Sequence, residues 1–180
     1  MQEDRRKRKS RAALRGALMK LMEQRSPSQI TIKALCETAD VNRSTFYANY
    51  GTIEDLLSDI HAEFFHRIEL LLPERREPET DPHHVTEAEF LRIIGLMAAP
   101  DSPLPLLLRD DDARLFVQNM VQHFMTRYVL THASCAGHYS YTYRTIGSFT
   151  VITQWIREGM PCPAQELAAL LSSMSADPIL

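Results

Sequence analysis

The sequence predicts an all-helical protein with a small N-terminal part and a larger helical C-terminal part. Apolar residues recur every three or four positions along most of the chain, whereas the alternation typical of strands is nearly absent. The charge divides as well: residues 1–50 hold 11 Lys and Arg against 5 Asp and Glu, and the remainder holds 9 against 18. This asymmetry indicates that the N-terminal part meets a polyanion, although a merely uneven surface charge is the simpler alternative.

The N-terminal part is predicted to contain short helices. The first helix covers residues 8–25, where Ser26-Pro27-Ser28 ends it. A short helix follows over 31–39, and Asp40 is expected to form the turn. Asn42 can then cap a second short helix, because its side-chain oxygen can accept an amide hydrogen two or three residues along. Thr52 and Asp55 resemble a capping box that opens a long helix reaching about Leu71.

The C-terminal part begins after a loop. Residues 73–86 contain three prolines and many charges, which predicts an exposed loop or linker. Further helices are predicted near 86–99, 111–133, 138–158 and 164–174. Gly159 followed by Pro161 is expected to end the third of these, and Pro163 suits the first turn of the last one.

Two short helices joined by a tight turn form a helix-turn-helix, whose second helix enters the DNA major groove. About two helical turns are enough to lie across a groove roughly 12 Å wide. On the second helix, Phe46 is spaced to face inward with Val41 and Ile32. Arg43 can then reach guanine, while hydroxyl and amide groups nearby can donate to phosphate. A solvated polar face is the alternative, but the basic N-terminal part favours DNA.

The candidate DNA-binding residues fall into two groups. The helix-turn-helix group comprises Thr31, Lys33, Asn42, Arg43, Ser44, Thr45, Tyr47, Asn49 and Tyr50. The second group belongs to a basic N-terminal arm, which is assigned to residues 1–7. Its basic residues continue beyond the arm to residue 9 and are Arg5, Arg6, Lys7, Arg8 and Lys9. Arg11 and Arg15 follow them. Such an arm can follow the DNA backbone or enter an A·T-rich minor groove; the alternative is a disordered tail.

The segment ITIKALCETADVNRSTFYANYGTIEDLL (30–57) resembles the DNA-binding domain of the tetracycline-repressor (TetR/AcrR) family of bacterial regulators, and the resemblance covers residues 8–68. The matched positions are Thr31, Leu35, Ala39, Val41, Thr45, Phe46, Tyr47, Tyr50, Glu54, Leu56 and Leu57. The resemblance implies that Thr45 and Tyr47 touch DNA, with Arg43 and Ser44 near the bases. The sequence departs from the family pattern where Asp40 replaces a glycine, Asn49 an aromatic or histidine, and Ile53 a phosphate-binding lysine.

The same resemblance implies that residues 69–180 form a ligand-binding and dimerisation domain. IGSFTVITQWIREGMPCPAQELAALL (146–171) is similar to the tail of many such regulators. The predicted dimer residues are Gly147, Phe149, Ile152, Trp155, Ile156, Leu167, Leu170, Leu171 and Met174, with Gly147 permitting close helix approach; their alternative is a monomer core. An aromatic pocket is predicted from Phe116, Met120, Phe124, Tyr139 and Tyr143, together with Tyr141, although ordinary core packing fits them equally.

These features predict a one-component DNA-binding transcriptional regulator. In the simplest case it is a repressor that binds a palindromic operator as a homodimer and is released by a small apolar or aromatic effector. The alternatives are a ligand-independent DNA-binding adaptor or nucleoid-associated factor whose body docks a protein partner, and a small helical enzyme. No catalytic motif, cofactor or metal spacing is recognised among the seven histidines and three cysteines. We expect a cytoplasmic protein without membrane association.

Overall fold

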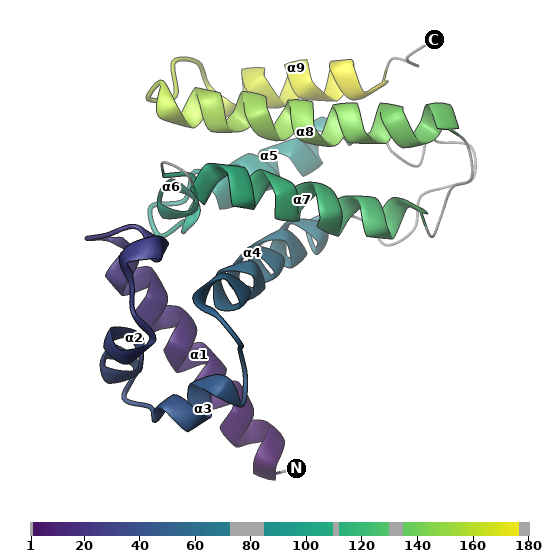
Figure 1. Ribbon diagram of the computed structural model, residues 1–180. Coiled ribbons are helices and arrows are strands. Elements are labelled where there is room, and N and C mark those ends of the chain that lie inside the picture. The colour runs from purple at the N-terminus through teal and green to yellow at the C-terminus, as the bar shows by residue number, and fades with distance from the viewer. Residues whose placement is uncertain (1, 73–84, 110–111, 130–134, 177–180) are drawn as a thin grey trace. The chain divides into compact units, whose positions relative to one another are not determined.

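A computed structural model describes residues 2–72, 85–109, 112–129 and 135–176 (Figure 1). Every regular element within these ranges is helical, which confirms the predicted all-helical class. The elements are α1 (Gln2–Met22), the 3-10 turn η1 (Pro27–Gln29), α2 (Ile32–Ala39), α3 (Arg43–Tyr47), α4 (Ile53–Glu69), α5 (Glu87–Met97), α6 (Leu104–Leu107), α7 (Asp112–Val129), α8 (Cys135–Arg157) and α9 (Ala164–Ala176). The loop predicted from Pro73 onward lies almost wholly outside the described residues.

The chain divides into two compact units. The N-terminal unit comprises Met1–Phe64 together with Pro103–Asn119, and the C-terminal unit comprises Phe65–Ser102 together with Met120–Leu180. Helices α4 and α7 therefore contribute residues to both units. None of the helices in the described part of the chain is both long enough and apolar enough to cross a bilayer.

The first helix of the N-terminal unit is longer than the sequence predicted. Helix α1 starts at Gln2, so the basic run Arg5–Lys9 is helical and its side chains are exposed. Arg, Lys, Glu and Gln are good helix formers, and no glycine or proline interrupts them before Gly16. The expectation of a separate arm is therefore corrected to a basic extension of α1. Further along, Leu14, Leu18 and Met22 are fully buried.

The two short helices are fixed by their ends. Thr31 begins α2, because its side chain accepts a hydrogen bond from the amide of Ala34 at 3.2 Å. Asp40 ends it in a left-handed conformation with φ 53° and ψ 48°, as expected of the turn. The cap expected from the Asn42 side chain is wrong, since that side chain makes no capping hydrogen bond. Instead, the Asn42 carbonyl accepts hydrogen bonds from the amides of Thr45 at 2.9 Å and Phe46 at 3.2 Å.

The long helix α4 begins as predicted. Thr52 Oγ1 accepts from the Asp55 amide at 3.1 Å, and Asp55 Oδ2 accepts from the Thr52 amide at 2.9 Å, which completes the capping box. The sequence did not predict the short helix α6, whose Leu104 and Leu107 are buried in the same unit. Arg109 lies two residues after α6. Its guanidinium donates to the carbonyls of Met22, Glu23 and Arg25 and so caps the end of α1.

The C-terminal unit is built on α5, which contacts both α8 and α9; these two helices run side by side (Figure 1). A capping box between Thr86 and Glu89 begins α5. Helix α8 ends at Arg157, and Gly159 follows in the turn as predicted, with left-handed conformations at Gly159 (φ 78°) and Met160 (φ 62°). The indole of Trp155 then donates to the Cys162 carbonyl at 3.0 Å, which holds the turn into α9.

Candidate nucleic-acid interface and apolar cavity

Helix α3 presents different side chains on its two faces. The Phe46 side chain is completely buried, whereas Tyr47 is 59% exposed and Arg43 and Ser44 are exposed. The Phe46 ring packs against the rings of Tyr47 and Tyr50, with centroid separations of 5.5 and 6.1 Å. This arrangement confirms the inward position predicted for Phe46, and it directs a guanidinium and two hydroxyl groups outward from one short helix.

A hydrogen-bonded cluster centred on Asp59 joins three segments of the N-terminal unit. The Tyr50 hydroxyl donates to Asp59 Oδ2 at 2.6 Å, and Arg15 Nε donates to the same oxygen at 2.7 Å. The Arg11 guanidinium donates to Asp59 Oδ1 and to the Tyr50 hydroxyl. Arg15 also pairs with Glu63. The Asp59 cluster therefore ties α1 and α4 to the residue that follows the turn after α3.

The electrostatics of the Asp59 cluster follow from these contacts. Partial burial acts to raise the pKa of Asp59, but hydrogen bonds from Arg15 and Tyr50 and the arginine charges outweigh it and hold that pKa below its ordinary value. Burial, followed by the hydrogen bond to Asp59, raises the pKa of Tyr50. The hydrogen bond to Tyr50 raises the pKa of Arg11. At neutral pH the cluster holds one carboxylate between two guanidinium groups.

Two of the predicted DNA-binding residues face the protein itself. Tyr50 is buried and its hydroxyl is engaged by Asp59, so it supports α3 and does not offer its hydroxyl to a partner. Asn49 is half-buried, and its amide donates to the Thr45 carbonyl at 2.7 Å. Both residues lie beyond the end of α3, where the chain turns back toward its own core. Arg11 and Arg15, expected to extend the basic arm, are likewise committed to the Asp59 cluster.

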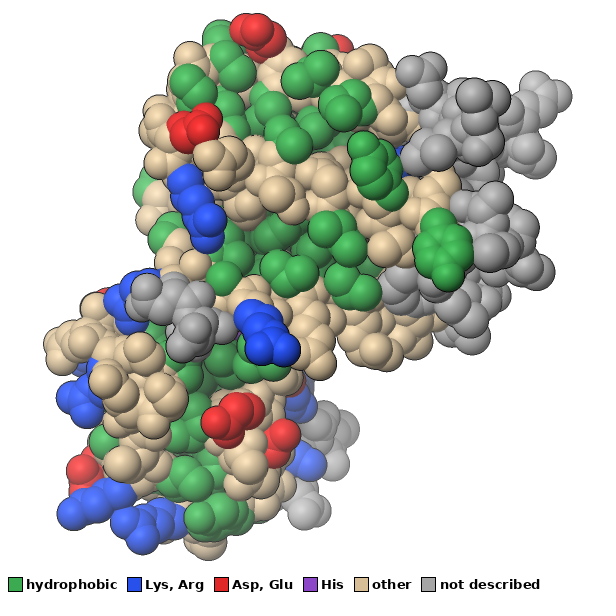
Figure 2. All heavy atoms as spheres, turned by 45° about the horizontal axis from the view of Figure 1, so that its top comes forward, with side chains coloured by type: hydrophobic (Ala, Val, Ile, Leu, Met, Phe, Trp, Pro, Cys, Tyr) green, Lys and Arg blue, Asp and Glu red, His purple; other side chains and the backbone are tan. Residues whose placement is uncertain are grey.

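The remaining predicted residues lie on or near the outer surface. Thr31 and Lys33 are exposed at the start of α2, where Lys33 pairs with Glu37 at 3.9 Å. Asn42 is exposed and Thr45 is half-buried. A polar hollow between α2 and α3 brings Lys33, Asn42 and Arg43 together with Glu37 and Asp40. Several Lys and Arg side chains stand out on the N-terminal unit in the space-filling view (Figure 2).

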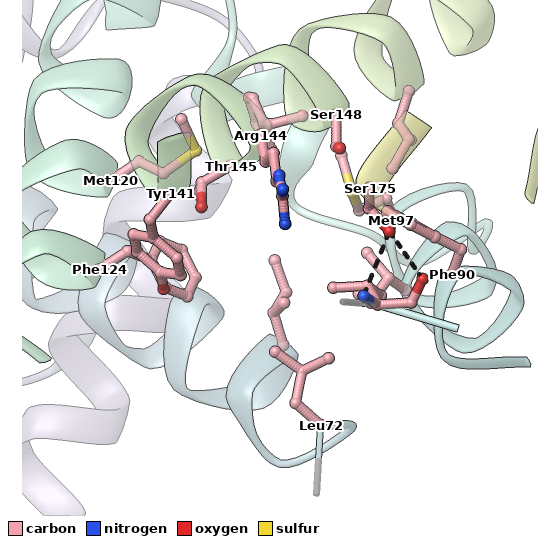
Figure 3. Close-up of a pocket in the computed structure, with 15 residues that line it drawn as sticks. Leu72, Phe90, Met97, Met120, Phe124, Tyr141, Arg144, Thr145, Ser148 and Ser175 are labelled. Atoms are coloured by element: carbon pink, nitrogen blue, oxygen red, sulfur yellow. Dashed lines mark hydrogen bonds between the residues drawn. The ribbon is translucent and has the colours of Figure 1, made fainter. Parts of the chain in front are cut away.

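The C-terminal unit contains an apolar cavity of about 100 Å³. Its described lining is Ile68, Leu72, Val85, Phe90, Ile93, Met97, Met120, Phe124, Tyr141, Arg144, Thr145, Ser148, Phe149, Ile152 and Ser175 (Figure 3). Met120, Phe124 and Tyr141 were among the residues proposed for a pocket from the sequence. Arg144 was missed, although the spacing of Tyr141, Thr145 and Ser148 with it marks one face of a helix.

The other predicted pocket residues lie elsewhere. Phe116 belongs to the N-terminal unit, where its ring packs against His61 and Phe64. Tyr139 and Tyr143 are exposed on α8. Residues two apart on a helix are rotated by about 200° from each other. Because Tyr141 faces the cavity, Tyr139 and Tyr143 therefore point away from it. The aromatic pocket predicted from all these residues is therefore corrected to a cavity with three of them.

The predicted dimer residues also separate into two groups. Phe149, Ile152, Trp155, Leu167 and Leu171 are buried in the core of their own unit, so their assignment to an interface is corrected. Leu170 and Met174 on α9 are 53% and 54% exposed, Val151 on α8 is exposed, and Gly147 and Ile156 are half-buried. Figure 2 shows hydrophobic side chains on this surface of α8 and α9. Among the residues that the structure describes, a Cβ atom added at Gly147 would meet nothing within 4 Å, so no helix approaches this glycine closely there.

The described cysteine and histidine side chains are candidate reactive or metal-binding groups, because the sequence holds three cysteines and seven histidines. Cys36 is buried, and burial raises the pKa of its thiol; Cys162 is half-buried. The side chain of Cys135 and both His83 and His84 lie outside the described residues. Where side chains are described, no three His, Cys, Asp or Glu groups come together as a metal site.

The chain was compared with known proteins. No protein-family model and no curated protein matches it. Among solved structures it is similar to the transcriptional regulator FadR from Bacillus subtilis in complex with stearoyl-CoA, with a TM-score of 0.57, 14% identity, and coverage of 94% of this chain and 99% of that one. The structure of RolR without ligand also matches, with a TM-score of 0.44 and 17% identity, covering 92% of this chain and 90% of that one. The structure of RolR with resorcinol matches with a TM-score of 0.45 and 18% identity, covering 96% of this chain and 90% of that one. The FadR likeness supports the all-helical fold.

Proposed function

We propose that this protein is a one-component DNA-binding transcriptional regulator of the tetracycline-repressor type. The observation that carries the proposal is the division of α3, where Phe46 is buried while Arg43, Ser44 and Tyr47 face outward. A short helix that is braced from behind and polar in front suits insertion into the major groove. The fold shared with FadR, a transcriptional regulator, also supports the proposal.

The outward residues receive separate roles in this proposal. Arg43 pairs with guanine O6 and N7, whereas Ser44, Thr45 and Tyr47 contact phosphate oxygens or base edges near it. Thr31 and Lys33 approach a phosphate at the N-terminus of α2, where the helix dipole favours an anion. The basic residues Arg5–Lys9 follow the DNA backbone as an extension of α1, which makes binding strongly dependent on salt.

The C-terminal unit is proposed to sense a small effector and to form a homodimer. The apolar cavity favours an effector-binding body over a ligand-independent adaptor. Val151, Leu170 and Met174 are proposed to meet their copies across a two-fold axis, which would match a palindromic operator. The effector releases DNA only if it has different affinities for the DNA-competent and incompetent states, and this release makes the protein a repressor.

DNA binding is tested with the full chain and a fluorescent fragment of its own promoter region, against random DNA of equal length at physiological salt. We expect tighter binding to the promoter and a steep loss of affinity as salt increases. Equal affinity for both fragments would refute the proposed function.

Sedimentation of the double variant Leu170→Glu, Met174→Glu tests the dimer, which should dissociate; an unchanged dimer would place the interface elsewhere.

A further inference from the structure

The exposed basic residues of α1 lie next to the point where α1 contacts the end of α3. The Asn49 amide donates to Ser10 Oγ at 3.5 Å, and Arg11 Nε donates to the Tyr50 hydroxyl at 3.1 Å. The Arg11 guanidinium also lies 5.8 Å from the centroid of the Tyr50 ring. Asn49 and Tyr50 follow α3 closely in the chain, so these contacts join the end of α3 to α1. From this contact α1 continues to the N-terminus (Figure 1).

Positive charge is concentrated just before this contact. The side chains from Arg5 to Lys9 are exposed, whereas Leu14 further along α1 is completely buried. Residues 2–9 hold five Lys and Arg against two Asp and Glu, which gives a net charge of +3. Because a helix rises by about 1.5 Å per residue, the basic residues lie within about 8 Å of Ser10 along the helix axis. They therefore stand beside the end of α3.

The two sides of this basic turn differ in how they face α3. Successive helical residues are rotated by about 100°, so residues four apart lie on the same side. Arg6 and Lys7 each lie four residues before one of the two residues of α1 that contact the end of α3, and therefore share their side. Arg5 and Lys9 are also four apart, but they lie on the opposite side of the helix. The segment thus offers two pairs of equal charge, one toward α3 and one away from it.

A basic helix in this position suits the phosphate backbone better than a minor groove. Phosphate strands border both edges of the major groove, so they flank any helix that lies in it. Long Lys and Arg side chains beside the end of that helix can reach such a strand and bind its oxygens. An α-helix with its side chains is about 10–12 Å wide, whereas the minor groove is only about 6 Å wide. The helical form of this segment therefore excludes its insertion into a minor groove of ordinary width.

We propose that Arg6 and Lys7 bind the phosphate strand at the edge of the major groove that α3 occupies. The inference rests on the proposed function, and it narrows the basic extension to two principal contacts. The bonds of Ser10 and Arg11 to the end of α3 fix the distance between these charges and the groove. The pair on the opposite side adds only to the general positive field. Because every nucleotide carries the same phosphate, these contacts raise affinity without reading sequence.

The test compares two double variants of the full chain that remove the same charge from opposite sides of α1. They are Arg6→Gln with Lys7→Gln, and Arg5→Gln with Lys9→Gln; glutamine is a good helix former, so both should keep α1 helical. Affinity for the promoter fragment is measured over a range of salt concentrations. Each lost phosphate contact lowers the slope of log affinity against log salt by about 0.9. The first variant should therefore lose nearly two in slope per protomer, and the second less than half as much.

Two further measurements accompany the salt series. At physiological salt, the variant of Arg6 and Lys7 should bind the promoter about ten- to thirtyfold more weakly than wild type. Exchanging A·T for G·C pairs that flank the half-sites should leave the affinity of wild type unchanged, because phosphate contacts carry no sequence information. Both double variants should rank different operator sequences in the same order as wild type.

Equal losses of slope in the two double variants would overturn the inference, since the basic residues would then act only as a general charge. A wild-type preference for A·T flanks that the variant of Arg6 and Lys7 lacks would overturn it in favour of the minor groove. Binding of wild type to phosphatidylserine vesicles, with DNA affinity unchanged in both variants, would overturn it in favour of a lipid surface. None of these results touches the proposed function while wild type prefers its promoter to random DNA. Equal wild-type affinity for promoter and random DNA would reject the proposed function, whatever the slopes of the variants.

Discussion

The two units of the chain are held together in different ways. In the N-terminal unit, polar side chains join segments that are far apart in sequence, as Arg11 and Arg15 do with Asp59 and as Arg109 does with the end of α1. In the C-terminal unit, the contacts around α5, α8 and α9 are chiefly apolar and surround a cavity. Directional bonds fix geometry, whereas an apolar lining leaves room for a ligand to change the packing.

This difference suits the two proposed tasks. A helix that reads DNA must keep its side chains in register with base edges, so its support has to be stiff. A sensor must instead have two conformations close in free energy, so that a ligand can shift their populations. The Asp59 cluster supplies the stiff support, and the cavity is the part whose packing a ligand can change. The following predictions test whether the division holds, beginning with the largest expected effect.

Replacing Phe46 should separate the two units most clearly. Phe46→Ala removes a fully buried ring and should lower the free energy of unfolding of the N-terminal unit by about 3–5 kcal/mol. The chain has a single tryptophan, Trp155 in the C-terminal unit, so its fluorescence reports that unit while circular dichroism reports both. In urea, the variant should lose helical signal early while the Trp155 transition stays in place.

Tyr47→Ala is the control for this experiment, because its ring is mostly exposed on the same helix. It should leave both unfolding transitions within about 0.5 kcal/mol of wild type, while weakening DNA binding. If Phe46→Ala shifts the Trp155 transition equally, the two units unfold together, and the stiff and adaptable regions are not energetically separate.

The position of Phe46 could be predicted from sequence because it depends on local spacing. A short helix between a turn and a capping box leaves few choices of inward face, and Asp40 and the Thr52–Asp55 pair mark both ends. The α8–α9 hairpin offered no such restriction. Phe149 and Leu170 are both apolar residues at helical spacing, yet one is buried and the other exposed. Which stripe α5 covers depends on long-range packing that periodicity does not contain.

The roles of Tyr50 and Arg144 were missed for a related reason. The Tyr50 hydroxyl bonds to Asp59 and Arg11, and Arg11 lies 39 residues earlier in the chain. Family resemblance marked Tyr50 as part of the motif but could not distinguish support from DNA contact. Arg144 lies among polar residues of α8, and only the arrival of α4, α5 and α7 around it creates a cavity. Predicting either role required tertiary contacts.

Acid should weaken the N-terminal unit through His61. This side chain is completely buried, its Nδ1 lies 2.9 Å from the Asn119 amide nitrogen, and burial lowers its pKa to about 4. The unfolded chain takes up a proton below about pH 6.5, whereas the folded unit resists it until about pH 4. The free energy of unfolding is therefore fully retained above pH 6.5. It falls by about 3 kcal/mol in total as the pH is lowered from 6.5 to 4.

The measurement is urea unfolding of wild type and His61→Gln between pH 7 and pH 4. The variant should be less stable at pH 7 and should show a flatter dependence on pH. His66→Gln removes an exposed histidine of the same helix and should keep the wild-type slope. An equally steep slope in His61→Gln would assign the acid sensitivity to other groups.

Removing the charge of Asp59 should have a smaller effect. Asp59→Asn leaves Arg11 and Arg15 without their shared carboxylate and should lower stability by about 1–3 kcal/mol at pH 7, less than for a fully buried pair. Because the folded pKa of Asp59 is lowered, its contribution is present above the unfolded value near 4 and is lost as pH falls through the folded value. The difference between variant and wild type should therefore shrink below pH 4.

Glu63→Gln is the comparison, since Glu63 pairs with Arg15 at a largely exposed position and should change stability by less than about 0.5 kcal/mol. DNA binding distinguishes a positioning role for Asp59 from a purely stabilising one. If Asp59 positions α3 through Tyr50, DNA affinity should fall in Asp59→Asn even at temperatures where the variant is fully folded. Unchanged affinity there would limit the Asp59 cluster to stability.

The smallest effects on folding stability should come from the outer face of α3, where neither substitution touches the core. Arg43→Ala should reduce discrimination between base pairs by about 1–3 kcal/mol, because it removes a bidentate contact to one base. Tyr47→Phe removes only a hydroxyl and should weaken binding to all sequences alike, by about 0.5–1.5 kcal/mol. Each variant is the control for the other when affinities are measured over a set of operator variants with one altered base pair. If Tyr47→Phe changes the ranking of sequences while Arg43→Ala weakens them uniformly, the two roles are exchanged: Tyr47 then contacts the bases and Arg43 the phosphate backbone.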